Sequence, residues 1–197
     1  MKKILLRTVW TLFLLNSFIT YSQVDFKADT EASVLNWKGF KPTGEHYGTV
    51  AVKNGFFTVK DKQILSGEFE IDMTSIVNLD IDADSEYNAK LVIHLKNEDF
   101  FNVEKYPEAS FKIVETENKG NKTIITGDLT IKGITHSIAV PASVKSDGEN
   151  LYVKSEKFKI DRSKWDIKYK SKSFFSDLGD NFIDNDIELS FVVTAKK

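Results

Sequence analysis

The segment from Gly67 to Met73 reads GEFEIDM, and its pattern decides the fold class. Hydrophobic residues occupy every second position from the phenylalanine onward, and acidic residues occupy the positions between them. Side chains two residues apart point to the same face of a β-strand, so this alternation predicts a strand with one buried face and one face in water. The residues predicted to point inward are Phe69, Ile71 and Met73.

The same period of two recurs along much of the chain. It is present in ITGDLTIKG from Ile125, in ITHSIAVPASV from Ile134 and in DIELSFVVTA from Asp186. Turn residues separate the runs, which indicates antiparallel hairpins. From Val34 onward we count about eight strand candidates, as expected for an antiparallel barrel or sandwich. The predicted turns are Asn54-Gly55, Lys119-Gly120-Asn121, Lys132-Gly133 and Asp147-Gly148.

The stretch LYVKSEKFKI changes the side on which its hydrophobic residues fall. Leu151 and Val153 are odd-numbered, whereas Phe158 and Ile160 are even-numbered. One extra residue in residues 155–157 would restore the alternation, so we predict a β-bulge there. Such a bulge bends a strand and helps a sheet to close on itself.

A helical segment interrupts the strands between residues 85 and 101. Its apolar residues are spaced four apart, which is typical of one face of a helix, and Ser85 can cap the first turn. Asn97 can cap a second, short turn, after which Pro107 returns the chain to extended structure. We therefore predict a helical crossover that covers one mouth of the sheet. The predicted apolar helix positions are Tyr87, Leu91 and Leu95.

The first 22 residues have the pattern of a secretory signal peptide. A positively charged start is followed by an apolar run over residues 9–19, and small residues precede a cleavage point between Ser22 and Gln23. A membrane anchor is the alternative, but the run is shorter than the roughly 20 residues that span a bilayer. We therefore predict a single domain over residues 23–197 that is periplasmic or secreted, with no membrane span in the mature chain.

Composition limits the classes of partner. The chain has 197 residues and no cysteine, and without the predicted signal peptide it carries a net charge of about −5. A negative balance argues against nucleic acid and against anionic lipid surfaces as partners. Without cysteine the domain has no disulfide, so its stability depends on packing.

The predicted inward face contains almost no ionisable side chain. An eight-stranded closed sheet is either filled by its own side chains or wide enough for one small ligand. A ligand burying about 300 Å² of apolar surface would gain about 7 kcal/mol before ordering costs, which permits micromolar binding. Both alternatives, a packed core and a ligand cavity, are open from alternation alone. The inward set also includes Val59, Val153, Ile160, Leu189, Phe191 and Val193.

Three long motifs stand out, which are HLKNEDFFNVEKYPEASF from His94, GDLTIKGITHSI from Gly127 and FKIDRSKWDIKY from Phe158. Together they resemble the YceI-like family of exported bacterial proteins. The resemblance implies an all-β fold with a helical crossover, an antiparallel eight-stranded lipocalin-like barrel. It also implies a long apolar ligand, an isoprenoid or a fatty-acid-derived amide, held along the axis for sequestration or transport. Dimers are common in this family, so a homodimer is a further expectation.

The sequence offers no motif for catalysis or for a metal. His46, His94 and His136 lack metal-ligand spacing, and neither GxSxG nor a cysteine nucleophile is present. We expect no catalytic residue, no metal and no cofactor other than a bound lipid. The alternatives are a solidly packed module that binds a partner, or an isomerase or hydrolase that acts on a lipid in the pocket. The predicted ligand-binding residues are Trp37, Phe57, Phe69, Ile71, Met73, Leu91, Leu95, Phe100, Phe101, Phe111, Ile113, Ile125, Leu129, Ile131, Ile138, Val140, Phe158, Trp165 and Tyr169.

Overall fold

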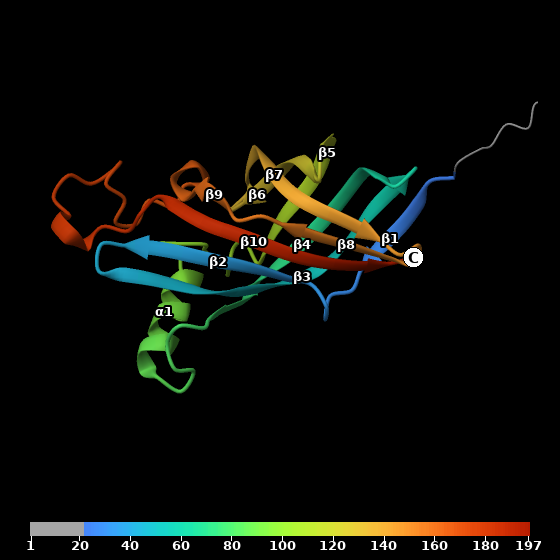
Figure 1. Cartoon of the computed structure of the whole chain (residues 1–197). Helices are drawn as coiled ribbons and strands as arrows, with labels where there is room; N and C mark the ends of the chain where they lie inside the picture. Colours follow the sequence, from blue (N-terminus) through green and yellow to red (C-terminus); the bar gives the residue numbers. More distant parts are fainter. Residues whose placement is uncertain (1–21) are drawn as a thin grey trace, which may run out of the picture.

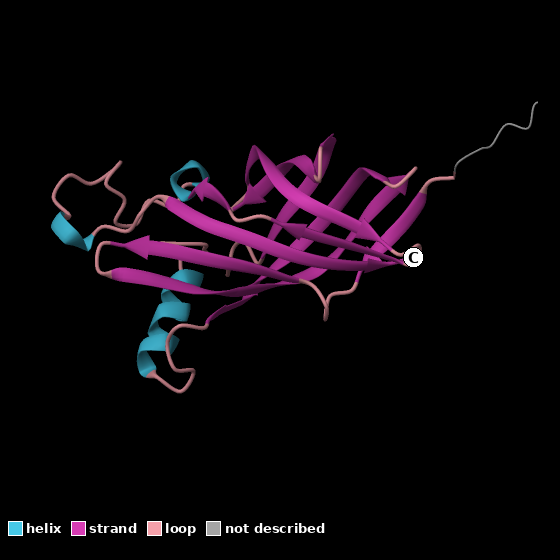
Figure 2. Ribbon diagram, in the orientation of Figure 1, coloured by secondary structure: helices cyan, strands magenta, loops and turns pink. Residues whose placement is uncertain are grey.

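Residues 22–197 are described by a computed structural model, and most of the predicted signal peptide, residues 1–21, lies outside the described residues. Strands form the body, and one α-helix projects from it near one end (Figures 1 and 2). The elements are β1 (Val24–Ala28), β2 (Val34–Lys41), β3 (Gly44–Lys60), β4 (Gln63–Asn78), α1 (Glu86–Lys96), β5 (Glu108–Lys119), β6 (Lys122–Ile131), β7 (Ile134–Ser146), β8 (Asn150–Ser155), β9 (Phe158–Asp161), the 3-10 helices η1 (Arg162–Trp165) and η2 (Gly179–Asn181), and β10 (Asp186–Lys196).

Eight of the strands form a closed antiparallel ring. Strands β2 to β8 pair in chain order, and β10 pairs with both β2 and β8, which closes the ring. Strand β1 joins β3 to β10 at the end that holds the termini, and β9 pairs with β10 farther along (Figure 1). The predicted fold class, an eight-stranded antiparallel sheet with one helical crossover, is confirmed.

The alternation seen in the sequence sets which side chains fill the ring. In β6 every second residue from Thr123 to Ile131 is buried, and the residues between them are half-buried. In β4 the hydrophobic residues of GEFEIDM are all buried, as predicted. Since successive side chains of a strand point to opposite faces, a hydrophobic residue at every second position lines the ring interior.

The predicted turn at Asn54-Gly55 is wrong. Both residues lie inside β3, at a point where the register with β4 shifts. The inward positions of β3 change there from even-numbered residues, such as Val52, to odd-numbered ones, such as Phe57. Glycine is required because the ring of Phe69 occupies the place of a Cβ, 2.2 Å from its ideal position. Asn-Gly therefore marks an irregularity within a long strand, and the true hairpin turn follows Lys60.

The predicted irregularity in residues 155–157 is present, as a break between two strands. Lys154 pairs with Val192 and Phe158 with Leu189, so this side has one residue more than β10 over the same length. At the break the Glu156 amide donates a hydrogen bond of 2.8 Å to the Pro141 carbonyl. The extra residue lets β8 and β9 both face β10 with their hydrophobic side chains inward.

The crossover helix begins and ends as the sequence predicts, but its inward face differs. Ser85 caps the helix by accepting a hydrogen bond of 3.2 Å from the Tyr87 amide. Leu95 is buried, whereas Tyr87 is 76% exposed and Asn88 is buried in its place. Within residues 22–197 the helices are all too short or too polar to cross a membrane.

Candidate functional site

The ring encloses a cavity, here called the inner chamber, whose exposed lining is entirely apolar. Every lining residue comes from a strand. The volume of this cavity is about 70 Å³, which is several times the roughly 10–15 Å³ that a single water molecule needs. Its lining residues are Leu35, Val52, Phe57, Phe69, Ile71, Phe111, Ile113, Ile125, Leu129, Ile138, Val140, Phe158, Leu189, Phe191 and Val193.

A second cavity, here called the mouth chamber, lies toward the crossover. The volume of this cavity is about 110 Å³. Its lining residues are apolar apart from Arg162 and Asp184. The helix and two loops complete the wall that the strands begin. Its lining residues are Leu35, Trp37, Gly39, Val50, Ile71, Met73, Ile76, Leu95, Phe100, Phe101, Ala109, Leu129, Ile131, Ile160, Arg162, Ile183, Asp184, Ile187 and Leu189.

The two chambers are stacked inside the ring and share part of their walls. Four residues line both of them, so the chambers meet at a waist formed by these side chains. The interior is therefore not filled by its own side chains, which argues against the solidly packed alternative. Apolar cavities of this kind stay dry and take up apolar molecules. The waist residues are Leu35, Ile71, Leu129 and Leu189.

All but three of the predicted ligand-binding residues line one of the chambers. Trp37, Met73, Leu95, Phe100, Phe101 and Ile131 line the mouth chamber, Ile71 and Leu129 lie at the waist, and Phe57, Phe69, Phe111, Ile113, Ile125, Ile138, Val140 and Phe158 line the inner chamber. The structure thus brings together residues from the crossover and from seven strands. Their role in binding a ligand stays a prediction.

Leu91, Trp165 and Tyr169 line neither chamber. Trp165 is 1% exposed, and its indole donates a hydrogen bond of 3.2 Å to the Leu129 carbonyl, so it is part of the core beside the mouth chamber. Tyr169 packs against the ring of His94, with centroids 4.6 Å apart. Leu91 is half-buried against the same core. These three side chains pack against the buried core that surrounds the mouth chamber.

Arg162 is a charged residue in the mouth wall that the sequence analysis missed. It is 1% exposed, and its guanidinium donates four hydrogen bonds to backbone carbonyls. Burial lowers the pKa of Arg162, while the charges of Asp161 and Asp184 act in the opposite direction. The four bonds fix the loop after β9 against the ring. Their acceptors, at 2.7 to 2.9 Å, are the carbonyls of Ile167, Tyr169, Ile183 and Asp184.

Two side-chain nitrogens near the mouth chamber are buried without a hydrogen-bond partner among residues 22–197. They are Nε1 of Trp37 and Nε2 of His94. The other ring nitrogen of His94 lies 3.2 Å from Nδ2 of Asn97, as expected for a residue that bonds within the crossover. Buried polar atoms usually have hydrogen-bond partners, so these two nitrogens make the mouth region the part of the interior with unsatisfied hydrogen-bond capacity.

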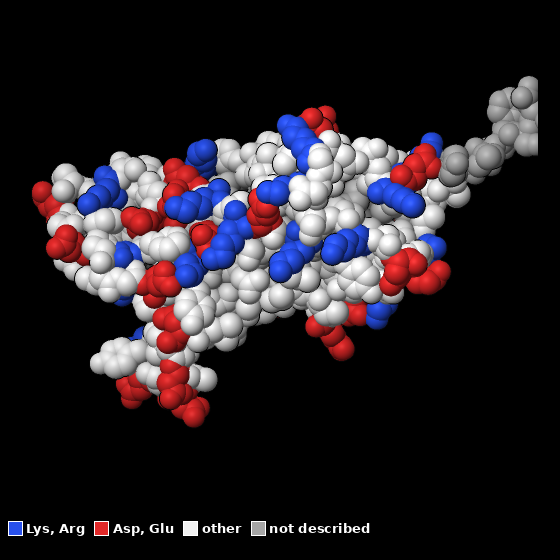
Figure 3. Space-filling view, viewed as in Figure 1, with Lys and Arg blue, Asp and Glu red and all other residues white. Residues whose placement is uncertain are grey.

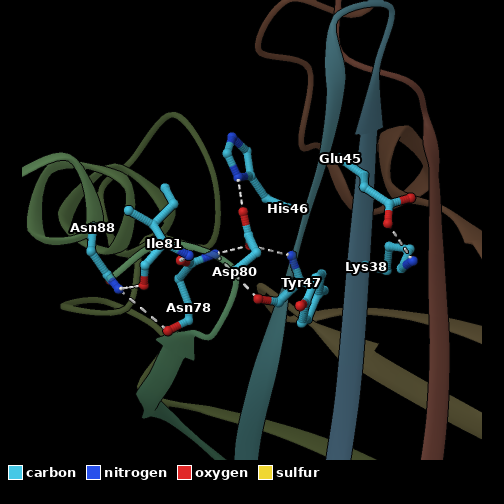
Figure 4. A network of polar contacts seen from close by, with 8 residues as sticks. All are labelled: Lys38, Glu45, His46, Tyr47, Asn78, Asp80, Ile81 and Asn88. Carbon is cyan, nitrogen blue, oxygen red and sulfur yellow. Dashed lines mark hydrogen bonds and ion pairs between the residues drawn. The ribbon is translucent and has the colours of Figure 1, made fainter. Parts of the chain in front are cut away.

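The carboxylate of Asp80 joins the loop before α1 to the β2–β3 hairpin. Its Oδ2 lies 2.8 Å from Nδ1 of His46, and its Oδ1 accepts a hydrogen bond of 2.8 Å from the Tyr47 amide (Figure 4). Asn78 also donates to this carboxylate. Burial alone would raise the pKa of Asp80, but the hydrogen bonds from Tyr47, His46 and Asn78 outweigh it and lower the pKa below its ordinary value.

Two asparagines extend this network to the helix. Asn78 accepts a hydrogen bond of 3.0 Å from the Ile81 amide. Asn88, on the inward face of α1, donates one of 2.8 Å to the Ile81 carbonyl (Figure 4). The helix is therefore attached to the mouth by buried side-chain amides as well as by Leu95.

A family model described as the YceI-like domain matches residues 26–195. The chain belongs to this family. A UPF0312 protein of Photorhabdus laumondii is 31% identical over 151 residues, which are 77% of this chain and 74% of that protein. Protein YceI of Escherichia coli O157:H7 is 30% identical over 104 residues, which are 53% of this chain and 51% of that protein. The match thus spans about half the length of the Escherichia coli relative.

Solved structures share the fold of this YceI-like chain. Burkholderia cenocepacia BcnA superposes with a TM-score of 0.63 at 20% identity, covering 86% of this chain and 99% of that one. A polyisoprenoid binding domain from Saccharophagus degradans gives 0.62 at 15% identity, covering 87% and 97%. The YceI protein of Campylobacter jejuni gives 0.52 at 20% identity, covering 100% and 99%.

The histidines of this YceI-like chain lie apart from one another. His46 contacts Asp80, His94 packs on Tyr169, and His136 lies 3.0 Å from the Lys164 carbonyl. No group of three potential metal ligands occurs within residues 22–197. On the face seen in Figure 3, basic and acidic side chains are interspersed.

Several lining residues were missed because they lie beyond an irregularity or at the mouth. In β3 the inward-facing positions change from even-numbered to odd-numbered residues at Asn54, and this change can be recognised in the sequence. Allowing for it would have added Val50 and Val52 to the predicted lining. In β2 the odd-numbered residues Leu35 and Gly39 continue the series of Trp37. Ala109 and Ile187 continue the alternation of Phe111 and Leu189, whereas Ile76, Ile183 and Asp184 carry no local signal for the cavity.

Proposed function

We propose that the protein is an exported binding protein that holds a long-chain apolar lipid in the two chambers, for sequestration or transport. The observation that carries the proposal is the pair of stacked apolar chambers within a closed ring. The candidate ligands are an isoprenoid and a fatty-acid-derived amide. The fold neighbour from Saccharophagus degradans, described as a polyisoprenoid binding domain, supports this class of ligand.

The energetics favour a hydrocarbon over a polar ligand. The inner chamber offers no polar atom on its exposed lining, so a polar group placed there would lose its water without a replacement. A methylene group instead gains about 0.8 kcal/mol on burial. A chain that fills both chambers therefore gains affinity along its whole length.

Export and domain organisation are part of the same proposal. The predicted signal peptide over residues 1–22 would direct the chain to the periplasm or the exterior, leaving residues 23–197 as one domain. A lipid carrier has a use in an aqueous compartment because free long-chain lipids do not dissolve there. N-terminal sequencing of the exported protein tests the cleavage point, and light scattering tests the expected homodimer.

Lipid extraction tests the central claim. The protein is purified without detergent, extracted with organic solvent, and the extract is analysed by mass spectrometry. We expect about one long-chain lipid per ring, and after delipidation we expect the protein to take up a polyprenol or a fatty amide. A protein that contains no lipid and takes up neither probe would contradict carriage. Chemical conversion of the added lipid would instead indicate an enzyme.

A further inference from the structure

Two phenylalanines are the last residues of β3 and β4, in the direction of the β3–β4 turn, that line the inner chamber. Phe57 is 2% exposed and Phe69 is 8% exposed, and their ring centroids lie 4.7 Å apart. Both rings line the chamber. The same buried cluster contains residues that line neither chamber, which are Phe26, Val59, Ile64, Ala142, Leu151, Val153 and Ala195.

Each of these rings lies opposite a glycine on the neighbouring strand. In the β3–β4 register, Phe57 pairs with Gly67 and Phe69 pairs with Gly55. A Cβ at Gly55 would lie 2.2 Å from Cδ1 of Phe69, and a Cβ at Gly67 would lie 3.3 Å from Cδ1 of Phe57. The missing side chains make room for the rings, as glycines do where another group approaches a strand closely. The two rings are therefore seated in the sheet.

The charged residues of the lining lie at the opposite end of the cavity, although the exposed lining of both chambers is almost wholly apolar. Arg162 and Asp184 contribute to the mouth chamber, whereas the exposed lining of the inner chamber is wholly apolar. An amphiphilic lipid gains most when its hydrocarbon tail occupies the inner chamber and its head group stays at the mouth. The end of the tail then reaches Phe57 and Phe69.

From this arrangement we infer that Phe57 and Phe69 form a floor that sets the maximum length of the bound hydrocarbon tail. The inference rests on the proposed function, since it assigns the lipid one orientation within the same cavity. Phe57 and Phe69 would make the protein select, among lipids of one class, those with tails up to a certain length. Tails that end at the floor bury every methylene, and longer tails leave part of their length outside the mouth.

A homologous series of straight-chain fatty amides tests the floor by calorimetric titration of the delipidated protein. For the unmodified protein we expect affinity to rise about fourfold with each added methylene, and to stop rising once the tail reaches the floor. We call the chain length at which the affinity stops rising the break. Phe57→Ala and the milder Phe57→Leu move the break to longer chains. Val52→Leu, which adds bulk to the same chamber, moves it to shorter chains.

Phe26→Leu is the matched control, because Phe26 is buried beside Phe57 in the β1–β3 register but lines neither chamber. We expect its break to stay at the position of the unmodified protein. A break that stays fixed in a folded Phe57→Leu protein, or that moves equally in Phe26→Leu, would overturn the inference while leaving lipid binding intact. Failure of the unmodified protein to bind any amide of the series would instead overturn the proposed function.

Discussion

The two chambers are built in different ways. The inner chamber is lined by strand residues alone, and its shape follows from cross-strand register. The mouth chamber is completed by α1, by the loop after it and by the loop after β9, which a buried arginine holds in place. The inner chamber therefore depends on many repeated contacts, and the mouth depends on a few specific ones.

This difference means that one chamber sets the length of the bound lipid tail and the other controls how the lipid enters the ring. A sheet register changes only in whole steps, and each step turns side chains to the other face, so the inner chamber has a fixed size. Loops held by a few hydrogen bonds open at lower free energy than the paired strands. We expect local opening to concentrate at the mouth.

Replacement of Arg162 should have the largest effect, because it should destabilise the mouth chamber and leave the inner chamber intact. Arg162→Met leaves four carbonyl groups without their donor, and we expect a loss of roughly 3–5 kcal/mol in the free energy of unfolding. Hydrogen exchange should speed up first in the loop between η1 and β10. Urea unfolding and hydrogen exchange by mass spectrometry measure the two effects.

Lys164→Met is the control for this change, because Lys164 is exposed two residues away. We expect it to alter the free energy of unfolding by less than about 0.5 kcal/mol. Equal protection of the loop in Arg162→Met and in the unmodified protein would show that the mouth does not depend on the guanidinium.

Filling either chamber with tryptophan should give intermediate effects that distinguish the two. Ile138→Trp narrows the inner chamber and should weaken long fatty amides by more than tenfold, since it excludes about two methylenes worth roughly 0.8 kcal/mol each, while short ones bind as before. Ile131→Trp narrows the mouth chamber and should weaken short and long amides alike. Fluorescent lipid displacement measures both, and identical length profiles for the two variants would contradict the stacked arrangement.

Asp80 should give the smallest effect, and it should depend on pH. Because the pKa of Asp80 is lowered in the folded state, its contribution is present above its ordinary value of about 3.9 and is lost as the pH falls below it. Asp80→Asn should cost about 1 kcal/mol at neutral pH and flatten the stability profile in acid. Thermal unfolding across this pH range measures the profile. Asp99→Asn, a change at an exposed residue on the turn after α1, is the control and should alter the free energy of unfolding at neutral pH by less than about 0.5 kcal/mol.

The sheet was predictable because one physical rule, alternation, repeats in almost every strand. The exception is instructive. Asn54-Gly55 has the strongest short-range signal for a hairpin, yet here the glycine makes room for Phe69 on the neighbouring strand. That reason involves a residue fourteen positions away, and a local motif does not contain it.

The cavity lining was predictable where it lies on strands and less so at the mouth. Phe111 and Val140 follow from alternation. Trp165 and Tyr169 have the chemistry of ligand contacts, but they pack against the core without lining a chamber, because the chain leaves the sheet at η1. Arg162 continues the inward series of Ile160, yet a charged residue is not expected inside a ring unless its carbonyl partners are known.

The last strand has a consequence for the order of folding. Strand β10 pairs with β1, β2, β8 and β9, so β1, β2 and β8 gain their second hydrogen-bonding neighbour, and β9 its partner, only when β10 docks. These pairings join residues far apart in sequence, and such closures are slow. While the chain is still emerging, the earlier hairpins can form an open sheet with an unprotected hydrophobic face. Completion of the wall therefore waits for residues 186–196.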